Sequence, residues 1–280
     1  MRDIFPLDFW KMSGAGNDFI VIDHRDGRIP VAHQPEFARR VCRRMFSVGA
    51  DGLILIEPPR DSSHDFSWRF YNADGSEAAM CGNGSRCAAR FARAHDVAQD
   101  HMRFATLAGI VQAEMVTDSR ARVFLPVPPS LPSGVVVEVE GRRLAGHLLT
   151  VGVPHLVLFA EENDIPVVRW GRELRMSSQF QPHGVNVNFV RPATGNRIHV
   201  RTYERGVENE TMACGTGAAA SAICAAAEYA LRPPVTVVTS GGEELIINFT
   251  TNASGAIAHV TLEGAARLIY RGSLTAEALD

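Results

Sequence analysis

The most constraining feature of this sequence is an internal duplication. RFYNADGSEAAMCGNGSRCAARF at 69–91 is similar to RTYERGVENETMACGTGAAASAICA at 201–225, and each segment reads as a strand, a turn and a CGxG motif that opens a helix. Two weaker matches keep nearly the same offset: GAGNDFIVID (14–23) with TVGVPHLVLF (150–159), and GADGLILI (49–56) with GVNVNFV (184–190). Three matches in the same order predict two similar domains.

The boundary between the two halves is predicted in PVPPSLPS (126–133), because proline interrupts regular structure. We expect an N-terminal half over 1–130 and a C-terminal half over 131–265, with a late strand in 266–280 packing back on the first half. Short β-rich runs such as FIVID and HLVLF outnumber the helices, so the predicted class is α+β, or mixed α/β, with largely antiparallel sheets. A length of 280 residues is enough for two domains.

The helices that follow the two CGxG motifs indicate how each half is built. Residues 217–231, GAAASAICAAAEYAL, are apolar or small on nearly every face, which predicts a helix that is buried all round. The helix predicted after Cys81 contains more arginine and is expected to be less enclosed. Each half is therefore predicted to be a sheet or barrel wrapped around a central helix.

Charge and composition exclude several classes of partner. The net charge of -3 provides no field of the kind that holds a nucleic-acid backbone, so no nucleic-acid partner is expected. The N-terminus lacks the apolar core of a signal peptide and no run of 18 apolar residues follows, which predicts a cytoplasmic protein without a membrane partner. The five cysteines are odd in number and lack CxxC spacing, so neither a disulfide framework nor a metal site is predicted.

Cys81 and Cys214 occupy matching positions, each just before a helix and beside glycines that let the backbone approach a ligand closely. A helix N-terminus attracts a carboxylate and lowers the pKa of a thiol. Two such groups suit the inversion of a stereocentre next to a carboxylate, because one thiolate removes the α-proton while the opposite thiol returns one. Pyridoxal phosphate would need a lysine, and Lys11 is the only one, so a cofactor-independent reaction is favoured.

Four motifs, KMSGAGNDFIVID, FYNADGSEAAMCGNGSRCAARF, GVNVNFV and YERGVENETMACGTGA, closely resemble those of diaminopimelate epimerases, and the resemblance runs from Lys11 to the end of the chain. It implies an isomerase without a cofactor that interconverts LL- and meso-2,6-diaminopimelate on the bacterial route to lysine and peptidoglycan. It also makes Cys81 and Cys214 the base and acid pair, in an active site in the cleft between the halves.

The same resemblance implies the other site residues. The reacting carboxylate would be bound by Gly82, Asn83, Gly215 and Thr216, the ammonium and distal groups by Glu204, Arg205, Asn17, Asn72 and Asn186, and His155 and Glu204 would assist catalysis. Val153 stands where the family usually has an asparagine, and Gly52 where some members have a glutamine. Family members are often dimers, and the resemblance places Tyr270 at the interface of a homodimer.

Structural interpretations stand beside these assignments. The three asparagines Asn17, Asn72 and Asn186 are also ordinary turn formers, His155 could be a satisfied buried histidine, and Glu204 with Arg205 could be a surface ion pair. Cys42, Cys87 and Cys224 are expected to be inert packing residues.

The sequence leaves two further functions open. One is a proline or hydroxyproline racemase of the same fold, although its first motif typically reads CGH where this chain has CGN. The other is a redox protein with a regulatory Cys81–Cys214 disulfide, which leaves the two glycine-framed helix starts unexplained.

Overall fold

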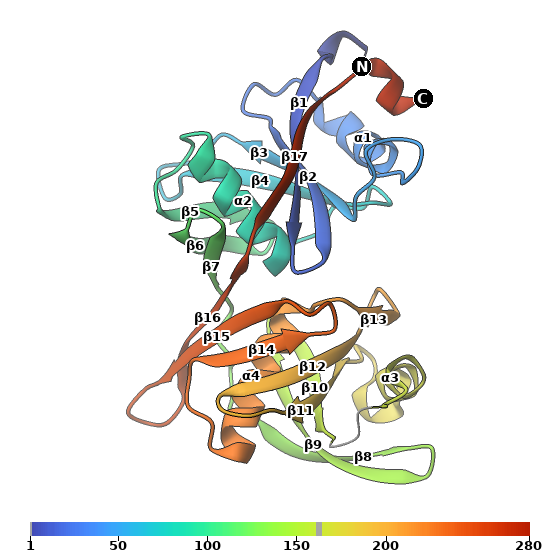
Figure 1. Ribbon diagram of the computed structural model, residues 1–280, viewed down its shortest axis with the longest axis vertical. Coiled ribbons are helices and arrows are strands. Elements are labelled where there is room, and N and C mark those ends of the chain that lie inside the picture. The colour runs from blue at the N-terminus through green and yellow to red at the C-terminus, as the bar shows by residue number, and fades with distance from the viewer. Residues whose placement is uncertain (1, 161–163) are drawn as a thin grey trace. The chain divides into compact units, whose positions relative to one another are not determined.

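The computed structural model describes residues 2–160 and 164–280. The chain separates into two compact units, the first formed by Met1–Val123 with Gly264–Asp280 and the second by Phe124–Glu263. Each unit is described by itself, with the labels of Figure 1.

The elements of the first unit are β1 (Leu7–Gly14), β2 (Asn17–Asp23), α1 (Gln34–Val41), β3 (Gly52–Glu57), β4 (Phe66–Asn72), α2 (Gly82–Ala94), β5 (His101–Thr106), β6 (Gly109–Thr117), β7 (Arg120–Phe124) and β17 (Arg267–Leu274). Its strands pair in the order β17-β1-β2-β3-β4-β5-β6-β7. The β2–β3 and β4–β5 pairs are parallel and the others antiparallel. The helices α1 and α2 make the two crossovers that parallel pairs require.

The elements of the second unit are β8 (Ser133–Val139), β9 (Arg142–Val151), β10 (Val153–Phe159), α3 (Val167–Met176), β11 (Asn186–Pro192), β12 (Arg197–Glu204), β13 (Asn209–Thr211), α4 (Gly215–Tyr229), β14 (Val235–Thr239), β15 (Glu244–Thr251) and β16 (Ile257–Ala265). Its strands pair in the order β8-β9-β10-β11-β12-β14-β15-β16, with β13 beside β12. Here β10–β11 and β12–β14 are the parallel pairs, crossed by α3 and α4.

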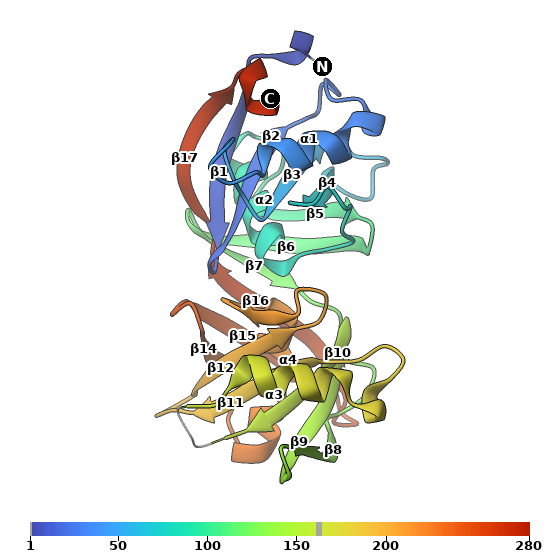
Figure 2. The same ribbon diagram turned by 90° about the vertical axis from the view of Figure 1, so that its right-hand side faces the viewer.

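The two units therefore repeat one pattern of strand pairing, which confirms the predicted mixed α+β fold of two similar domains. The strand that begins the pattern comes from different parts of the chain. In the second unit it is β8, which precedes the rest of the unit, whereas in the first unit it is β17, which comes from the C-terminus and pairs with β1. Figure 2 shows β17 lying along β1.

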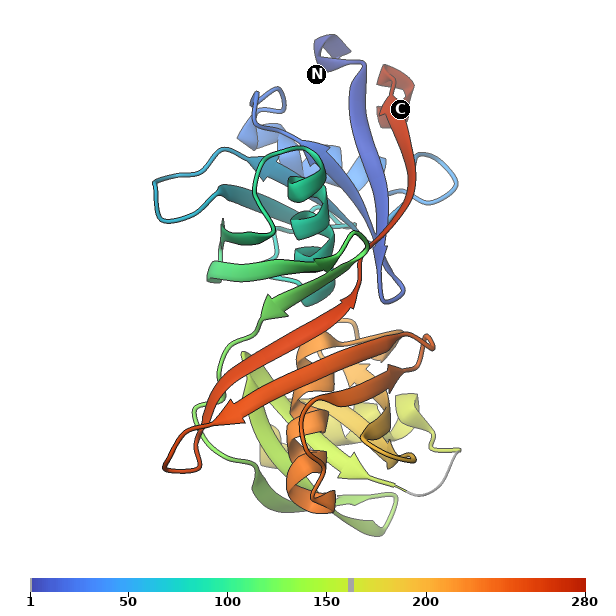
Figure 3. The ribbon, with the colours of Figure 1, turned by 60° about the vertical axis from the view of Figure 1, so that its left-hand side comes forward.

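The central helix of each unit is enclosed by strands. In the second unit α4 contacts β9, β10, β11, β12, β14 and β15, and in the first α2 contacts β1, β2, β3 and β6. Figure 3 shows α4 with the strands of its own unit curving around it. The predicted helix at 217–231 is shifted: α4 begins two residues earlier, and it ends at Tyr229 because Ala230 adopts a left-handed conformation with φ of 53°. The prediction of an all-round buried helix is confirmed for residues 217–225.

The expectation that α2 would be less enclosed is wrong, because nine of its 13 residues are buried, compared with nine of the 15 residues of α4, and its arginines do not all face solvent. Arg86 is completely buried, and its guanidinium group donates to the carbonyls of Ala265 and Gly82, each over 3.3 Å, and to Oδ1 of Asn83 over 3.0 Å. Hydrogen bonds to acceptors of this kind offset the cost of burying a charge. Arg86 thereby ties the start of α2 to the strand ends near Ala265.

The outer helices α1 and α3 build a second core on the other face of each sheet. Phe37 and Val41 of α1 pack with Ile20 and Leu53 in the first unit. The side chains of Trp170 and Leu174 pack in the same way with Val187 and Phe189 in the second. Within the described residues, no helix is long and apolar enough to cross a membrane.

Candidate active site

Cys81 is the N-cap residue of α2. Its backbone is extended, with φ of -143° and ψ of 119°, and its sulfur accepts a hydrogen bond from the backbone N–H of Gly84 over 3.4 Å. The sulfur also faces the Oδ1 atom of Asn17 at 3.7 Å, and the thiol donates to it. The positive end of α2 and the Gly84 amide both favour a thiolate, whereas the Asn17 oxygen favours the protonated thiol. Cys81 is therefore placed to exchange a proton.

The Asn17 side chain is oriented by a charged network. Its Nδ2 donates to Oδ2 of Asp51 over 2.6 Å, and Oδ1 of Asp51 accepts from Arg44 over 2.9 Å. Arg44 also donates to Asp18 over 2.6 Å, and Asp18 is ion-paired with Lys11 at 2.6 Å. A carboxylate only accepts hydrogen bonds, so Asp51 fixes which end of the Asn17 amide points toward Cys81. Sequence reasoning missed Asp51 and Arg44 because neither lies in the Asn17 or Cys81 motif.

Asn83 lies in the first turn of α2 and is buried. Its Oδ1 atom accepts from Arg86, which leaves the nitrogen end of the amide to face the other way. The close approach of β1 to this turn requires glycine at position 14, because a Cβ there would lie 2.8 Å from the carbonyl oxygen of Asn83. The motifs GAGNDF and CGNG are thus packed against each other.

Two positions of the first unit have a simpler structural explanation. The side chain of Asn72 donates to Ser76 within the turn that follows β4, so its hydrogen bond serves this turn. A Cβ at Gly52 would lie 2.6 Å from the ring of Phe70 and 2.7 Å from the carbonyl oxygen of Tyr71. A larger side chain would not fit here without a shift of the backbone.

Cys214 is the N-cap residue of α4, in the position that corresponds to Cys81. Its backbone is also extended, with φ of -114° and ψ of 113°, and the residue is 9% exposed. Unlike Cys81, it makes no side-chain cap hydrogen bond, and its sulfur lies 3.7 Å from the hydroxyl oxygen of Thr216. Gly215 and Thr216 begin the first turn of α4, so the predicted carboxylate-binding residues of this unit follow Cys214 directly.

His155 is fully buried on β10, next to Asn188 of β11. The Nδ2 atom of Asn188 lies 3.2 Å from Nδ1 of His155. Burial, together with the positive charge of Arg205, lowers the pKa of His155 to about 3, so the ring is neutral near pH 7. The first turn of α4 is close by, because a Cβ at Gly217 would lie 2.3 Å from Oδ1 of Asn188 and 3.3 Å from the Cys214 sulfur.

Asn186, Glu204 and Arg205 are brought together at the ends of β11 and β12. The Oδ1 atom of Asn186 accepts from the backbone N–H of Arg205 over 2.8 Å, and the Arg205 guanidinium group donates to the carbonyl of His183. Burial raises the pKa of the Glu204 carboxyl, although a hydrogen bond from Thr211 opposes that shift. The proposed surface ion pair between Glu204 and Arg205 is not formed by these contacts.

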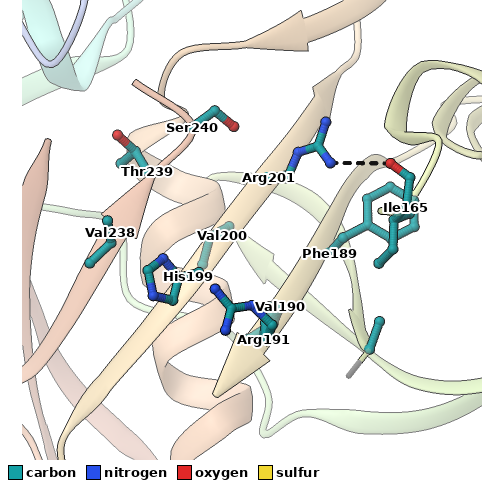
Figure 4. A pocket seen from close by; sticks show the side chains of 11 residues that line it. Ile165, Phe189, Val190, Arg191, His199, Val200, Arg201, Val238, Thr239 and Ser240 are labelled. Carbon is teal, nitrogen blue, oxygen red and sulfur yellow. Dashed lines mark hydrogen bonds between the residues drawn. The ribbon is translucent and has the colours of Figure 1, made fainter. Parts of the chain in front are cut away.

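A separate hollow of about 200 Å³ lies on the second unit. Figure 4 shows Arg191, His199 and Arg201 among the side chains that line it, with Arg201 donating to the carbonyl of Ile165. None of the predicted site residues lines it. Arg201 is also paired with Glu210 at 2.7 Å, so its charge is compensated within the protein.

Solved structures of other proteins share this fold of two similar units. A hydroxyproline epimerase from Agrobacterium vitis superposes with a TM-score of 0.69 and 15% identity, covering 99% of this chain and 94% of that one. A phenazine biosynthesis protein of the PhzF family from Bacillus anthracis superposes with a TM-score of 0.72 and 11% identity, covering 96% and 98%. At these identities the likeness concerns the fold alone.

Sequence comparison is more specific. The family model described as diaminopimelate epimerase matches residues 9–126 and 147–268. The diaminopimelate epimerase of Aquifex aeolicus is 43% identical over 98% of this chain and 100% of its own length, and that of a Hydrogenobaculum species is 41% identical over 95% and 98%. The chain belongs to the diaminopimelate epimerase family.

Proposed function

We propose that this chain is a pyridoxal-independent, two-base epimerase that interconverts LL- and meso-2,6-diaminopimelate, an intermediate of bacterial lysine and peptidoglycan synthesis. The observation that carries the proposal is the position of Cys81 and Cys214, each the N-cap of the central helix in one of two units with the same strand order. Membership of the family selects the substrate from the amino acids that such a pair could invert.

In the proposed reaction, one cysteine as thiolate takes the α-proton, which leaves an electron pair on the α-carbon. The other cysteine, as thiol, delivers its own proton to the opposite face of that carbon and becomes the thiolate. One proton is taken and one is given, so atoms and charge balance and the configuration is inverted. The mechanism needs one sulfur on each side of the α-carbon.

The carbanion requires electrostatic stabilisation at the carboxylate, where negative charge develops. In the proposal, the backbone N–H groups at the start of α2 and α4 supply it, since each helix N-terminus carries about half a positive charge. Asn83 adds a side-chain donor whose orientation is set by Arg86. Thr216 is the corresponding polar residue beside Cys214.

The second amino-acid head group distinguishes diaminopimelate from proline. We assign it to the polar group around Arg205, whose backbone amide is anchored by Asn186, and to Asn17 in the first unit. The buried Glu204 carboxylate is the proposed partner of an ammonium group, because a cation beside it would offset the cost of its burial. A proline racemase would need no such set of charged and amide side chains.

The single lysine supports a reaction without a pyridoxal Schiff base. Lys11 is 7% exposed, pairs with Asp18 at 2.6 Å and donates to the carbonyl of Gly49. Its amine is therefore committed to contacts that hold β1, the start of β2 and the loop before β3 together. Within the described residues, no group of three His, Cys, Asp or Glu side chains could hold a metal ion.

A stereochemical assay tests the proposed function. Purified protein without added cofactor, in the presence of a chelator, should convert LL-diaminopimelate to the meso form and should not racemise L-proline or trans-4-hydroxy-L-proline. Turnover of proline with no turnover of diaminopimelate would replace the proposal by the racemase alternative. Absence of any inversion, with a reversible disulfide between Cys81 and Cys214, would favour the redox alternative.

Asp51 offers a test of how Asn17 is held. In the Asp51→Ala variant the Asn17 amide loses its fixed orientation, so kcat/KM for diaminopimelate should fall about tenfold to a hundredfold, because misplacement of a binding group costs catalysis. Steady-state kinetics measures this.

The matched control for Asp51 is Asp23→Ala. Asp23 also pairs with an arginine, Arg25, in the first unit, but it lies at the far end of β2. Its replacement should leave kcat/KM within twofold. Equal effects of the two substitutions would remove Asn17 from the proposed site.

We also propose that the protein is a cytoplasmic homodimer that pairs through β17. Ile269 and Tyr270 of this strand are 54% and 44% exposed, and Tyr270 packs edge-on against Phe9 at a centroid distance of 5.9 Å. Exposed apolar groups on an edge strand suit pairing with a second copy.

Sedimentation should show a dimer, and Tyr270→Asp together with Ile269→Asp should give monomers. A wild-type monomer at micromolar concentration would contradict this proposal.

A further inference from the structure

Asn188 is the most informative residue in the second unit that the sequence analysis did not select. It lies on the same face of β11 as Asn186, two residues away, and beneath the first turn of α4. It is completely buried, and so is His155 beside it. Its hydrogen bonds determine which ring nitrogen of His155 carries the proton.

The orientation of the Asn188 amide is set by its neighbours. Its Nδ2 lies 3.1 Å from the carbonyl oxygen of Leu156, and its Oδ1 accepts from the hydroxyl of Thr202 over 2.9 Å. A carbonyl can only accept, so the nitrogen end of the amide must face Leu156. The second hydrogen of Nδ2 then points to Nδ1 of His155, 3.2 Å away.

Since Nδ1 of His155 receives a hydrogen, it must present its lone pair, and in a neutral ring the proton is then on Nε2. The Nε2 atom is buried and has no hydrogen-bond partner among the residues that the structure describes. A buried N–H donor without an acceptor is costly, so the Nε2–H group is free to bind an acceptor on a ligand.

We infer that Asn188 is a positioning residue that holds His155 as its Nε2–H tautomer, so that His155 serves the reaction as a hydrogen-bond donor to an anionic acceptor and not as a proton acceptor. This inference rests on the proposed function for the identity of the acceptor, a carboxylate oxygen of the amino-acid substrate. The charged group that acts on the ring is Arg205, and its positive charge further disfavours protonation of His155.

The tautomer can be observed directly in the intact protein. In ¹⁵N-histidine-labelled protein, long-range ¹H–¹⁵N correlation spectra distinguish Nε2–H, Nδ1–H and doubly protonated rings, and the His155 signals are assigned by their loss in His155→Gln. We expect a neutral Nε2–H ring from pH 8 to pH 5. A proton on Nδ1, or titration of the ring in this range, would overturn the inference, whatever substrate the enzyme proves to use.

Two substitutions of His155 distinguish a role as hydrogen-bond donor from a role as base. The side chain of glutamine can present an N–H near the position of Nε2–H, but it cannot take up a proton, whereas leucine offers neither. His155→Gln should therefore keep kcat/KM within about tenfold of the wild type, and His155→Leu should lose about a hundredfold, the cost of one preorganised donor. Equal, complete loss in both folded variants would show that His155 acts as a base.

The role of Asn188 is tested by Asn188→Asp, with Thr202→Val as the matched control. A carboxylate at 188 demands a hydrogen from Nδ1 and so reverses the tautomer, and kcat should fall with little change in KM. Thr202→Val removes only the hydroxyl on the other side of the amide and should leave the Nε2–H spectrum unchanged. If Asn188→Asp does not fold, the wild-type spectrum and the His155 pair still decide the question.

Discussion

Replacing either Cys81 or Cys214 by alanine should lower the rate of diaminopimelate epimerisation by at least about a thousandfold, because one face of the α-carbon then lacks its proton donor or acceptor. Cysteine to serine should do nearly as much harm, since an alcohol is a far weaker acid than a thiol near neutral pH. The rates are measured by separating the LL and meso isomers over time, with the fold of each variant checked by circular dichroism.

The matched control is Cys87→Ala, in the same helix as Cys81. Cys87 is completely buried, and burial raises the pKa of its thiol to about 12, so it is not available as a base. This variant should keep its catalytic rate and lose only stability. Full epimerase activity in Cys81→Ala or Cys214→Ala would remove that thiol from the mechanism and, with it, the argument from symmetry.

Solvent deuterium should enter the product and not the remaining substrate during the first part of the reaction in ²H₂O. A thiol exchanges its hydrogen with solvent, so the cysteine that protonates the α-carbon delivers deuterium, while the opposite thiolate keeps the abstracted proton until the product leaves. Mass spectrometry of the separated LL and meso isomers at low conversion gives the two enrichments, and the reaction is run in both directions.

A single base that served both faces would give a different pattern. It would return part of the original proton to the product and would label the substrate pool at a comparable rate. Diaminopimelate incubated in ²H₂O without enzyme is the control for exchange in solution. Early labelling of substrate and product to equal extents would rule out the two-base mechanism even if both cysteines proved essential.

The duplicated sequence predicted the duplicated fold because similar segments, with the same order of apolar runs and turns, form the same strand pairs. It also placed Cys81 and Cys214 before helices of matching position, which the structure shows as N-cap residues. Helix limits were less accurate. The helix predicted from residue 217 begins at Gly215, two residues earlier.

The residues that orient the candidate site were not predicted. The helix after Cys81 was expected to be less enclosed because it contains more arginine, and nothing near Arg86 in the sequence shows that the Ala265 carbonyl would accept its hydrogen bond. Asp51 was passed over for the same reason, although it is the direct partner of Asn17. For Asn188 a signal existed, since its two-residue spacing from Asn186 places both on one face of a strand.

The sequence by itself determined the class of fold, the membership of a family and the two cysteines on which the proposed chemistry depends, because these follow from local patterns and their repetition. Only the tertiary structure decided how the polar groups are oriented: Asn17 by Asp51, Asn83 by Arg86, and His155 by Asn188. The physical reason is that a buried amide or imidazole takes its orientation from whichever donors and acceptors the strand pairing and helix packing bring beside it.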